Sequence, residues 1–548
     1  DLRAAVMSAE SCCRDTWPPA TCQLVERLRD PACYPHPTGA IRVIETHISW
    51  VFLTGPFAYK LKKPRNLGFL DYTSLEKRRH FCEEEIRVSG RFAPGLYLAA
   101  VPITGSVEDP RVSGSGPAIE WAVKLVQFDE ADRLDAQFEM GRLTAADCSR
   151  LGSEIAELEH GLAVASVDQP WGTTDSVRAA VAINLDQLRR ERPDLADRIE
   201  RVASWLDGRL EGLRAVVEGR RVAGRVRECH GDLHLGNLVL HHGRMTPFDA
   251  IEFSSTLRWI DVANDVAFLL MDLEARGRPD LAAQVRSGWM EVADDHAAAL
   301  VLPAYEVYRA VVRAAVAALR NGPGREARAE TDRYLGVAER LMRPLEPVMV
   351  AMSGVSGSGK SKLAAMLVGE LQAVRLRSDV ERKRLAGLQP TDRPADASAE
   401  ATIYGDALTR RVYERLAERA AMLLDAGTSV IIDAACTRRW QRDLIAGLAH
   451  SRGVSLTWLE IDLPEDLLLA RVTARQAAGG DASDASAAVV KRQLAAREPI
   501  TTEELSAAGG IVRRLRLTEA DQQDSSFFDR IRLVVFKRLG MHHEGLLP

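Results

Sequence analysis

The stretch GVSGSGKS at residues 354–361 constrains the fold more than any other part of this chain. It follows the apolar run VMVAM, precedes a helical pattern and satisfies G-x-x-x-x-G-K-[ST] at every fixed position. In such a strand–loop–helix context, backbone N–H groups at the start of the helix can surround phosphate oxygens. Lys360 is expected to reach the β- and γ-phosphates and Ser361 to bind Mg²⁺. The loop itself is predicted to bind the nucleotide, ATP or GTP, through Gly354, Ser356, Gly357, Ser358 and Gly359.

The sequence after this loop alternates between helical and strand patterns. Helices are predicted at 360–373, 404–426 and 438–451, and strands at 374–378, 429–434 and 455–463. Alternation of this kind predicts a parallel sheet with helices on both faces. We therefore expect residues 346–548 to form an α/β domain, with the small and polar residues 476–488 as a loop.

Charged residues lie near the predicted strand ends of this domain. Asp379 and Arg382 are three apart in RSDVERKR, so that the carboxylate can activate an acceptor hydroxyl while the guanidinium holds an anionic group. Asp433 ends the strand SVIID and is predicted to face the nucleotide and substrate. Arg471 and Arg475, four apart, are predicted to close over the transferred phosphate as part of a lid. The alternatives are a surface ion pair for the first two residues and a solvated helix face for the last two.

A second group of residues occurs earlier, in HGDLHLGN at 230–237 and FDAIEF at 248–253. Phosphate transfer from ATP needs one carboxylate that orients or deprotonates the acceptor and oxygen ligands for Mg²⁺. Asp232, Asn237 and Asp249 supply that set, and Gly231 permits a tight backbone. The alternative that deserves most weight is a degenerate, purely structural domain. A zinc site formed by the neighbouring histidines is disfavoured, because the glycines oppose a helix here.

These two motifs resemble the catalytic and metal loops of aminoglycoside phosphotransferases and related protein-kinase-like enzymes. The resemblance implies Asp232 as catalytic base, with Asn237 and Asp249 as magnesium ligands. It also implies a phosphate-binding lysine in FAYKLKKP, where Lys60 fits best and Lys62 is an alternative. Its partner glutamate is expected on the next helix, at Glu85 or, failing that, Glu84. Asp261 and Asp265 are expected to brace the loop. The glycine-rich G-x-G-x-x-G loop of protein kinases is missing from the hairpin, which disfavours protein substrates.

The later half resembles the kinases that include gluconate kinase, phage polynucleotide kinase and zeta toxins. Together the resemblances cover nearly the whole chain and imply a bifunctional, Mg·ATP-dependent phosphotransferase that acts on hydroxyl groups of small-molecule metabolites. The two sites are expected to work in succession or one to regulate the other. The alternative is a nucleic-acid-end or nucleotide-sugar kinase in the later half with a regulatory kinase-like half.

The expected fold is an α+β bilobal protein-kinase-like domain at 1–345 followed by the α/β domain at 346–548. The small lobe is expected at about 1–128, including strands in 41–63 and 120–128 and a helix at 74–93, and the large helical lobe at about 129–345. A net charge of −5 argues against a generally nucleic-acid-coating surface, although nucleic acid stays a less favoured partner. No apolar run approaches the ~20 residues that span a bilayer, and the eight scattered cysteines do not form a disulfide framework. We expect a cytoplasmic protein without a membrane partner.

Overall fold

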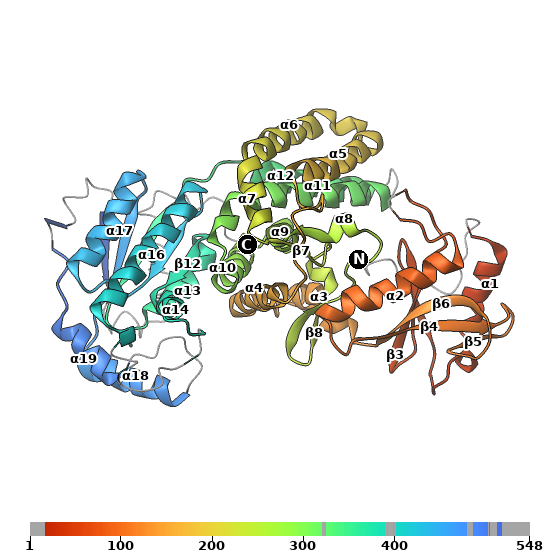
Figure 1. Cartoon of the computed structure of the whole chain (residues 1–548), viewed down its shortest axis with the longest axis horizontal. Helices are drawn as coiled ribbons and strands as arrows, with labels where there is room; N and C mark the ends of the chain where they lie inside the picture. Colours follow the sequence, from red (N-terminus) through yellow and green to blue (C-terminus); the bar gives the residue numbers. More distant parts are fainter. Residues whose placement is uncertain are drawn as a thin grey trace. The chain divides into compact units, whose positions relative to one another are not determined.

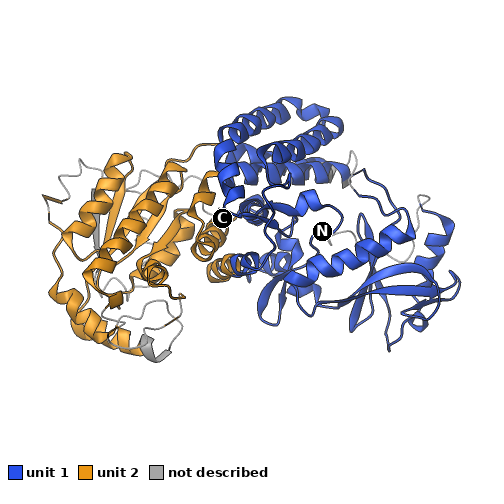
Figure 2. Cartoon of the chain, in the orientation of Figure 1, with its two compact units in different colours: residues 1–144, 154–277, 301–342 blue, residues 145–153, 278–300, 343–548 orange. Residues whose placement is uncertain are grey.

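The computed structural model describes residues 17–68, 70–320, 325–389, 392, 398, 402–478, 486–501, 503–504 and 512–517. By its internal contacts the chain forms two compact units, which Figure 2 shows in different colours. Unit 1 comprises residues 1–144, 154–277 and 301–342, and unit 2 comprises residues 145–153, 278–300 and 343–548. Unit 2 thus includes two segments from the range expected for the helical lobe. No helix in the described part of the chain is long and apolar enough to cross a membrane.

The first part of unit 1 is an antiparallel sheet with the strand order β1-β2-β3-β6-β4-β5 (Figure 1). The elements of this lobe are α1 Pro19–Arg27, η1 Pro31–Cys33, β1 Arg42–Glu45, β2 Ser49–Leu53, β3 Phe57–Lys62, α2 Leu75–Phe92, β4 Tyr97–Gly105, β5 Pro110–Val112 and β6 Ala118–Val126. The Ser74 hydroxyl caps α2 by accepting the N–H of Lys77 at 3.2 Å, which confirms the predicted helix start. Buried Cys82 of α2 lies in one apolar cluster with Ala58 and Val123 of the sheet. Residues 41–63 form three strands, one more than the predicted hairpin.

The second part of unit 1 is mostly helical. Its elements are η2 Glu130–Asp132, α3 Leu134–Glu139, the later part of α4 Ala145–His160, α5 Thr174–Glu191, η3 Pro193–Leu195, α6 Ala196–Gly212, α7 Arg214–Val222, β7 Val226–Glu228, η4 Leu235–Asn237, β8 Leu238–His241, β9 Arg244–Pro247, α8 Ser255–Arg258, β10 Trp259–Asp261, α9 Val262–Ala275, α11 Leu302–Arg320 and α12 Arg325–Leu341. All residues of α9 are buried, because its sequence VANDVAFLLMDLEA is apolar around most of the helix. This central helix carries carboxylates that hold the HGDLHLGN loop.

Unit 2 contains a parallel sheet with the strand order β12-β13-β11-β14-β15. Its elements are α10 Pro279–Ala293, η5 His296–Leu300, β11 Met349–Ser353, α13 Lys360–Glu370, β12 Val374–Arg377, α14 Ser378–Leu385, α16 Asp406–Asp425, β13 Val430–Asp433, α17 Arg439–Ser451, β14 Leu456–Ile461, α18 Glu465–Ala478, α19 Ala487–Ala495 and β15 Val512–Leu517. The predicted α/β class is confirmed, and β15 is an additional strand. Of the predicted loop at 476–488, residues 479–485 lie outside the described part.

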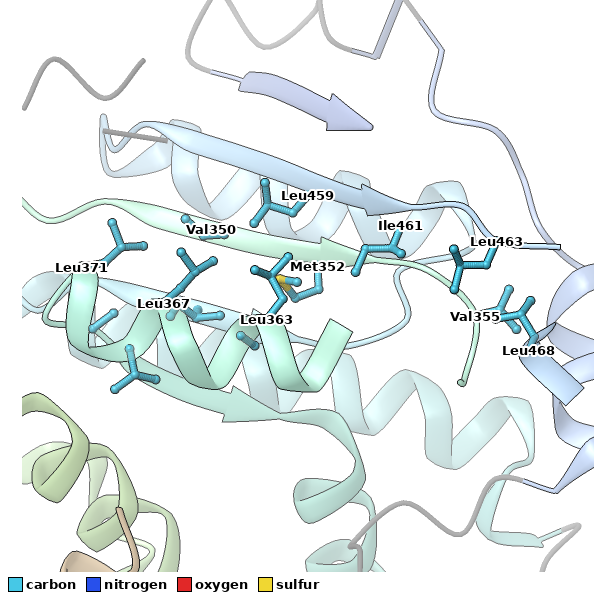
Figure 3. Close-up of a cluster of buried hydrophobic side chains, with 14 of the residues drawn as sticks. Val350, Met352, Val355, Leu363, Leu367, Leu371, Leu459, Ile461, Leu463 and Leu468 are labelled. Atoms are coloured by element: carbon cyan, nitrogen blue, oxygen red, sulfur yellow. The ribbon is translucent and has the colours of Figure 1, made fainter. Parts of the chain in front are cut away.

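The core of unit 2 forms where α13 packs on the sheet (Figure 3). Leu363 and Leu367 point from α13 toward Val350 and Met352 of β11, and Leu459 of β14 lies beside them. Burial of these aliphatic side chains fixes the start of α13 at the carboxyl end of β11. In open parallel sheets, ligands bind at this edge, where the connections turn to opposite faces.

Candidate active sites

The HGDLHLGN loop of unit 1 is held in place by two carboxylates of α9. The backbone N–H groups of His230 and Gly231 donate to the two oxygens of Asp265, each at 2.8 Å. The N–H of Leu235 donates to Asp272 at 3.1 Å. Gly231 has a φ of +85°, and a Cβ there would lie 2.8 Å from a backbone oxygen, so only glycine fits. Asp265 therefore braces the loop as expected, because its carboxylate accepts hydrogen bonds from the loop backbone.

Asp232 and Asn237 are brought together by this loop. The Asn237 amide donates to the backbone oxygen and to Oδ2 of Asp232, both at 3.0 Å. His234 accepts the N–H of Gly236 at Nδ1, so the ring proton sits on Nε2, 3.6 Å from Asp232 Oδ2. Burial lowers the pKa of His234, which keeps this imidazole neutral at pH 7. The Asp232 side chain stays 35% exposed, so an acceptor hydroxyl can reach it.

Lys60 joins the small lobe to the metal loop. Its Nζ donates to Glu85 Oε1 at 2.9 Å and to Asp249 Oδ1. Asp249 follows β9 in a left-handed conformation with a φ of +63°, and its N–H donates to the Tyr97 hydroxyl at 2.8 Å. Burial raises the pKa of the Asp249 carboxyl, but nearby positive charges, including Lys60 and Lys62, and the hydrogen bond from Lys60 together lower that pKa to about 2. Asp249 is therefore ionised at neutral pH, as a magnesium ligand needs to be.

Lys62 occupies a different environment from Lys60. It is fully buried and donates to Glu85 Oε2 at 2.6 Å and to Glu252, which also accepts the Tyr72 hydroxyl. Lys60 is 12% exposed and lies beside Asp249. The geometry thus favours Lys60 for phosphate binding and gives Lys62 a structural role. Glu252 and Tyr72 are absent from the predicted site, although Glu252 stands in FDAIEF itself.

This difference predicts different effects for two matched substitutions. Lys62→Met removes the cation that pairs with buried Glu252 and one of the two cations that pair with buried Glu85, so we expect it to lower the free energy of unfolding by about 3–5 kcal/mol. Lys60→Met is expected to weaken Mg·ATP use by unit 1 with a smaller loss of stability. Chemical denaturation and ATP titration, both in a Lys360→Ala background, measure the two effects. A Lys62→Met protein of wild-type stability would contradict the assignment.

Glu84, the other candidate partner, faces away from this lysine pair. It pairs with Arg87 at 2.6 Å and with Arg258 at 2.7 Å. Asp261, which was expected to brace the HGDLHLGN loop, makes no contact with that loop among the described hydrogen bonds and ion pairs. It caps α9 and pairs with Arg220 at 2.7 Å. Of the expected bracing residues, Asp265 alone holds the loop directly.

The phosphate-binding loop of unit 2 has glycines in backbone conformations that other residues rarely adopt. Gly354, Gly357 and Gly359 have φ values of +156°, +87° and +92°. A Cβ on Gly357 would lie 2.8 Å from the backbone oxygen of Leu468, so α18 packs closely against this loop. Ser358 is buried in the same turn, and its N–H donates to the Val355 carbonyl at 3.1 Å. Lys360 starts α13, where unpaired N–H groups favour an anion.

Ser361 and Asp433 form the part of this site that can hold a metal. The Ser361 hydroxyl donates to Asp433 Oδ1 at 3.1 Å. The other oxygen, Asp433 Oδ2, is buried and has no hydrogen-bond partner among the described residues. A buried carboxylate oxygen without a partner is costly, and a magnesium ion or its bound water would satisfy it. Asp433, assigned to the substrate from sequence, therefore fits a position on the metal side.

The loop opens into a cavity of about 340 Å³. Of the predicted residues, the lining includes Ser356, Lys360, Ser361, Asp379, Arg382 and Asp433. Arg471 is absent from the described lining, and the side chain of Arg475 lies outside the described residues. Other basic and polar groups take part instead, namely Arg377, Arg438, Gln441, Arg492 and Gln493. Gln493 of α19 accepts the N–H of Ser356 at 2.8 Å, so α19 supplies side chains here.

Arg382 lines this cavity from a fixed position. Its Nη1 donates to the Ile403 carbonyl at 2.9 Å and to the Thr409 hydroxyl at 3.0 Å. The guanidinium carbon lies 5.0 Å from the centre of the Tyr404 ring. Its Nε is buried without a hydrogen-bond partner in the described structure. These contacts leave a donor that can serve an anionic ligand, and the role of Arg382 in binding the acceptor stays a prediction.

Comparisons with known proteins found similarities in several parts of the chain. A family model described as an AAA domain matches residues 349–500. Among solved structures, the chain is similar to a choline/ethanolamine kinase family protein from Mesorhizobium loti, with 13% identity, coverage of 58% of this chain and 95% of that one, and a TM-score of 0.37. It is also similar to a sugar kinase from Janibacter sp. HTCC2649, with 21% identity, coverage of 36% and 95%, and a TM-score of 0.26.

A relative matches both halves at once. The uncharacterized protein Rv2004c of Mycobacterium tuberculosis is 30% identical over 484 residues, which cover 86% of this chain and 93% of that protein. The uncharacterized protein Mb2027c of Mycobacterium bovis matches to the same extent. Since the similarity runs through nearly the whole of both proteins, the chain belongs to the family of these mycobacterial proteins.

Proposed function

We propose that the chain is a bifunctional, Mg·ATP-dependent phosphotransferase that phosphorylates hydroxyl groups of small-molecule metabolites. One observation carries this proposal. Each unit separately brings together a lysine for the phosphates, an ionisable carboxylate for the metal and a second carboxylate for the acceptor. A purely structural domain has no need for this lysine and these two carboxylates, because buried charges, whether paired or unsatisfied, rarely add stability.

In unit 1, Asp232 acts on the acceptor. Its carboxylate accepts the proton of the substrate hydroxyl, whose oxygen forms a bond to the γ-phosphorus of ATP while the bond to the ADP oxygen breaks. Asn237 orients Asp232 through its hydrogen bond at 3.0 Å. Lys60, fixed by Glu85, binds the phosphates. Positioning and charge stabilisation of this kind supply most of the catalysis in phosphate transfer.

In unit 2, Asp379 takes the same role. It lies on α14 at the edge of the cavity, three residues before Arg382 on the same helix. Lys360 and the loop N–H groups hold the phosphates, while Arg382 binds an anionic group of the acceptor. Arg492 of α19 lines the cavity and supplies a further positive charge toward the transferred phosphate.

Mg²⁺ fits both sites by the chemistry of the oxygen donors. Asn237 and Asp249 would hold it in unit 1, and Ser361 and Asp433 in unit 2. Asp433 Oδ2, which is buried and has no hydrogen-bond partner within the described part of the chain, supports the second position most strongly. When bound, the ion neutralises phosphate charge as it develops during transfer.

Mass spectrometry of a bacterial metabolite extract tests the proposal. The extract is incubated with Mg·ATP and wild-type protein, with an Asp232→Asn/Asp379→Asn double variant as the matched control. We expect at least one hydroxyl compound to gain phosphate with the wild type and none with the double variant. If no small molecule gains phosphate, the metabolite-kinase proposal fails. Transfer to RNA ends that weakens steeply with salt would then favour the nucleic-acid alternative.

A further inference from the structure

Residues 278–300 pack against the P-loop domain at residues 343–548, here called the phosphate-binding half, although they lie far from it in the sequence. This segment, α10 and η5, stands in the chain between α9 and α11 of unit 1, but it belongs to unit 2. The Gln284 amide donates to the Ala365 carbonyl of α13 at 2.9 Å, and the Ser287 hydroxyl accepts the N–H of Arg375 in β12 at 3.1 Å. The phosphate-binding half is therefore completed by a segment that precedes it by about fifty residues.

One side chain of α10 contacts an arginine of the cavity directly. Glu291 Oε1 accepts a hydrogen bond from Arg377 Nη1 at 3.3 Å, with the two side chains 22% and 18% exposed. Arg377 ends β12, pairs in register with Asp433 across the sheet and stands two residues before Asp379. It lines the same cavity as these two carboxylates. The contact thus fixes a cationic group at the acceptor side.

A second group of contacts from this segment consists of ion pairs to α14 and α16. Asp294, just after α10, pairs with Arg384 of α14 at 3.5 Å and with Arg419 of α16. Glu381 of α14 pairs with the same two arginines, at 2.6 Å from Arg384. Because Asp379 and Arg382 are on the same short helix, this cluster fixes the orientation of the acceptor residues as well.

We propose that Glu291 is a positioning residue of the phosphate-binding half, which holds the Arg377 guanidinium where it binds a phosphate or carboxylate group of the acceptor. An arginine has many rotamers, so a fixed carboxylate lowers the entropy lost when the guanidinium binds an anion. The basic lining residues Lys360, Arg377, Arg382, Arg438 and Arg492 outnumber the acidic ones, which also favours an anionic ligand. The inference rests on the proposed function for the direction of transfer, but anion binding itself requires no catalysis.

Phosphate binding tests the proposal without a known acceptor. The full chain is loaded with saturating Mg·AMPPNP, which fills the nucleotide phosphate positions, and inorganic phosphate is titrated by calorimetry. We expect Arg377→Gln to raise the Kd for phosphate about tenfold, the equivalent of ~1.4 kcal/mol. Glu291→Gln is expected to raise it about threefold or more, and Glu291→Asp to restore part of the loss. The double variant is expected to equal Arg377→Gln, since Glu291 acts through Arg377.

Ser287→Ala is the matched control, because it removes another polar contact between α10 and β12. We expect a wild-type Kd for this variant, and thermal unfolding reports whether each protein is folded. If Glu291→Gln and Ser287→Ala lower Tm alike and leave the phosphate Kd unchanged, the role of Glu291 is structural and the proposal is wrong. The absence of phosphate binding to the loaded wild type would also overturn it. Failure of the proposed function is seen separately, as a lack of transfer in the metabolite extract.

Discussion

Asp232→Asn is expected to slow phosphate transfer by unit 1 by orders of magnitude while the fold and nucleotide binding persist. Asparagine keeps the size of the side chain, and its oxygen can still accept the hydrogen bond from Asn237. It cannot take the proton of an acceptor hydroxyl. Loss of a general base lowers the transfer rate by about 10²–10⁴-fold. Rate measurements on the product that depends on unit 1 give the size of the loss.

The matched control for this variant is Asp197→Asn, an exposed aspartate in α6 of the same unit. It is expected to transfer phosphate at the wild-type rate. If Asp232→Asn also keeps the wild-type rate, Asp232 is not the base. If it loses nucleotide binding and cooperative unfolding instead, the residue serves the structure of the loop.

Asp379→Asn is expected to have a loss of similar size, about 10²–10⁴-fold, at unit 2. Asp379 lines the cavity beside Arg382 and is positioned by α14, whose buried face is fixed by the ion pairs of Glu381. The substitution removes the acceptor base but leaves Lys360 and the phosphate-binding loop unchanged. Binding of a fluorescent ADP analogue is therefore expected to stay at the wild-type level while transfer is lost.

Asp443→Asn is the control for unit 2, since Asp443 is a 61% exposed residue of α17 in the same unit. It is expected to behave as the wild type in both assays. Equal transfer rates for Asp379→Asn and Asp443→Asn would remove Asp379 from the mechanism.

Motifs within a single loop were predictable because local backbone sets their geometry. Asp232 and Asn237 are five residues apart in one loop, and the hydrogen bonds between them follow from that loop's turn. Lys60 and Glu85 required only the correct order of strand and helix, which the alternating pattern and the Ser74 cap indicate. The phosphate-binding loop was predictable from its fixed glycine, lysine and serine positions, and its glycines have positive φ values in the structure.

Side chains that meet through distant packing were not predictable. Glu291 reaches Arg377 across 86 positions of sequence, because α10 packs beside β12. Helical spacing predicted Arg471 and Arg475 as parts of a lid, but spacing within one helix does not show which side chains of the next helix face the cavity. Arg492 and Gln493 of α19 line it in the described structure. Lys60 and Lys62 share one strand face, and their neighbours Asp249 and Glu252 separate their roles.

The measurement that tests the two-site account most directly follows each phosphorylated product of the metabolite extract over time. Wild type, Asp232→Asn and Asp379→Asn are compared with Mg·ATP under the same conditions. If the two sites act on different compounds, the account predicts that each product disappears in one single variant and persists in the other. If they act in succession on one compound, each single variant is expected to block one of the two phosphorylation steps. A singly phosphorylated compound that accumulates with Asp379→Asn would place unit 1 first in a sequence of two steps. If both single variants form every product at the wild-type rate, the chain does not contain the two transfer sites described.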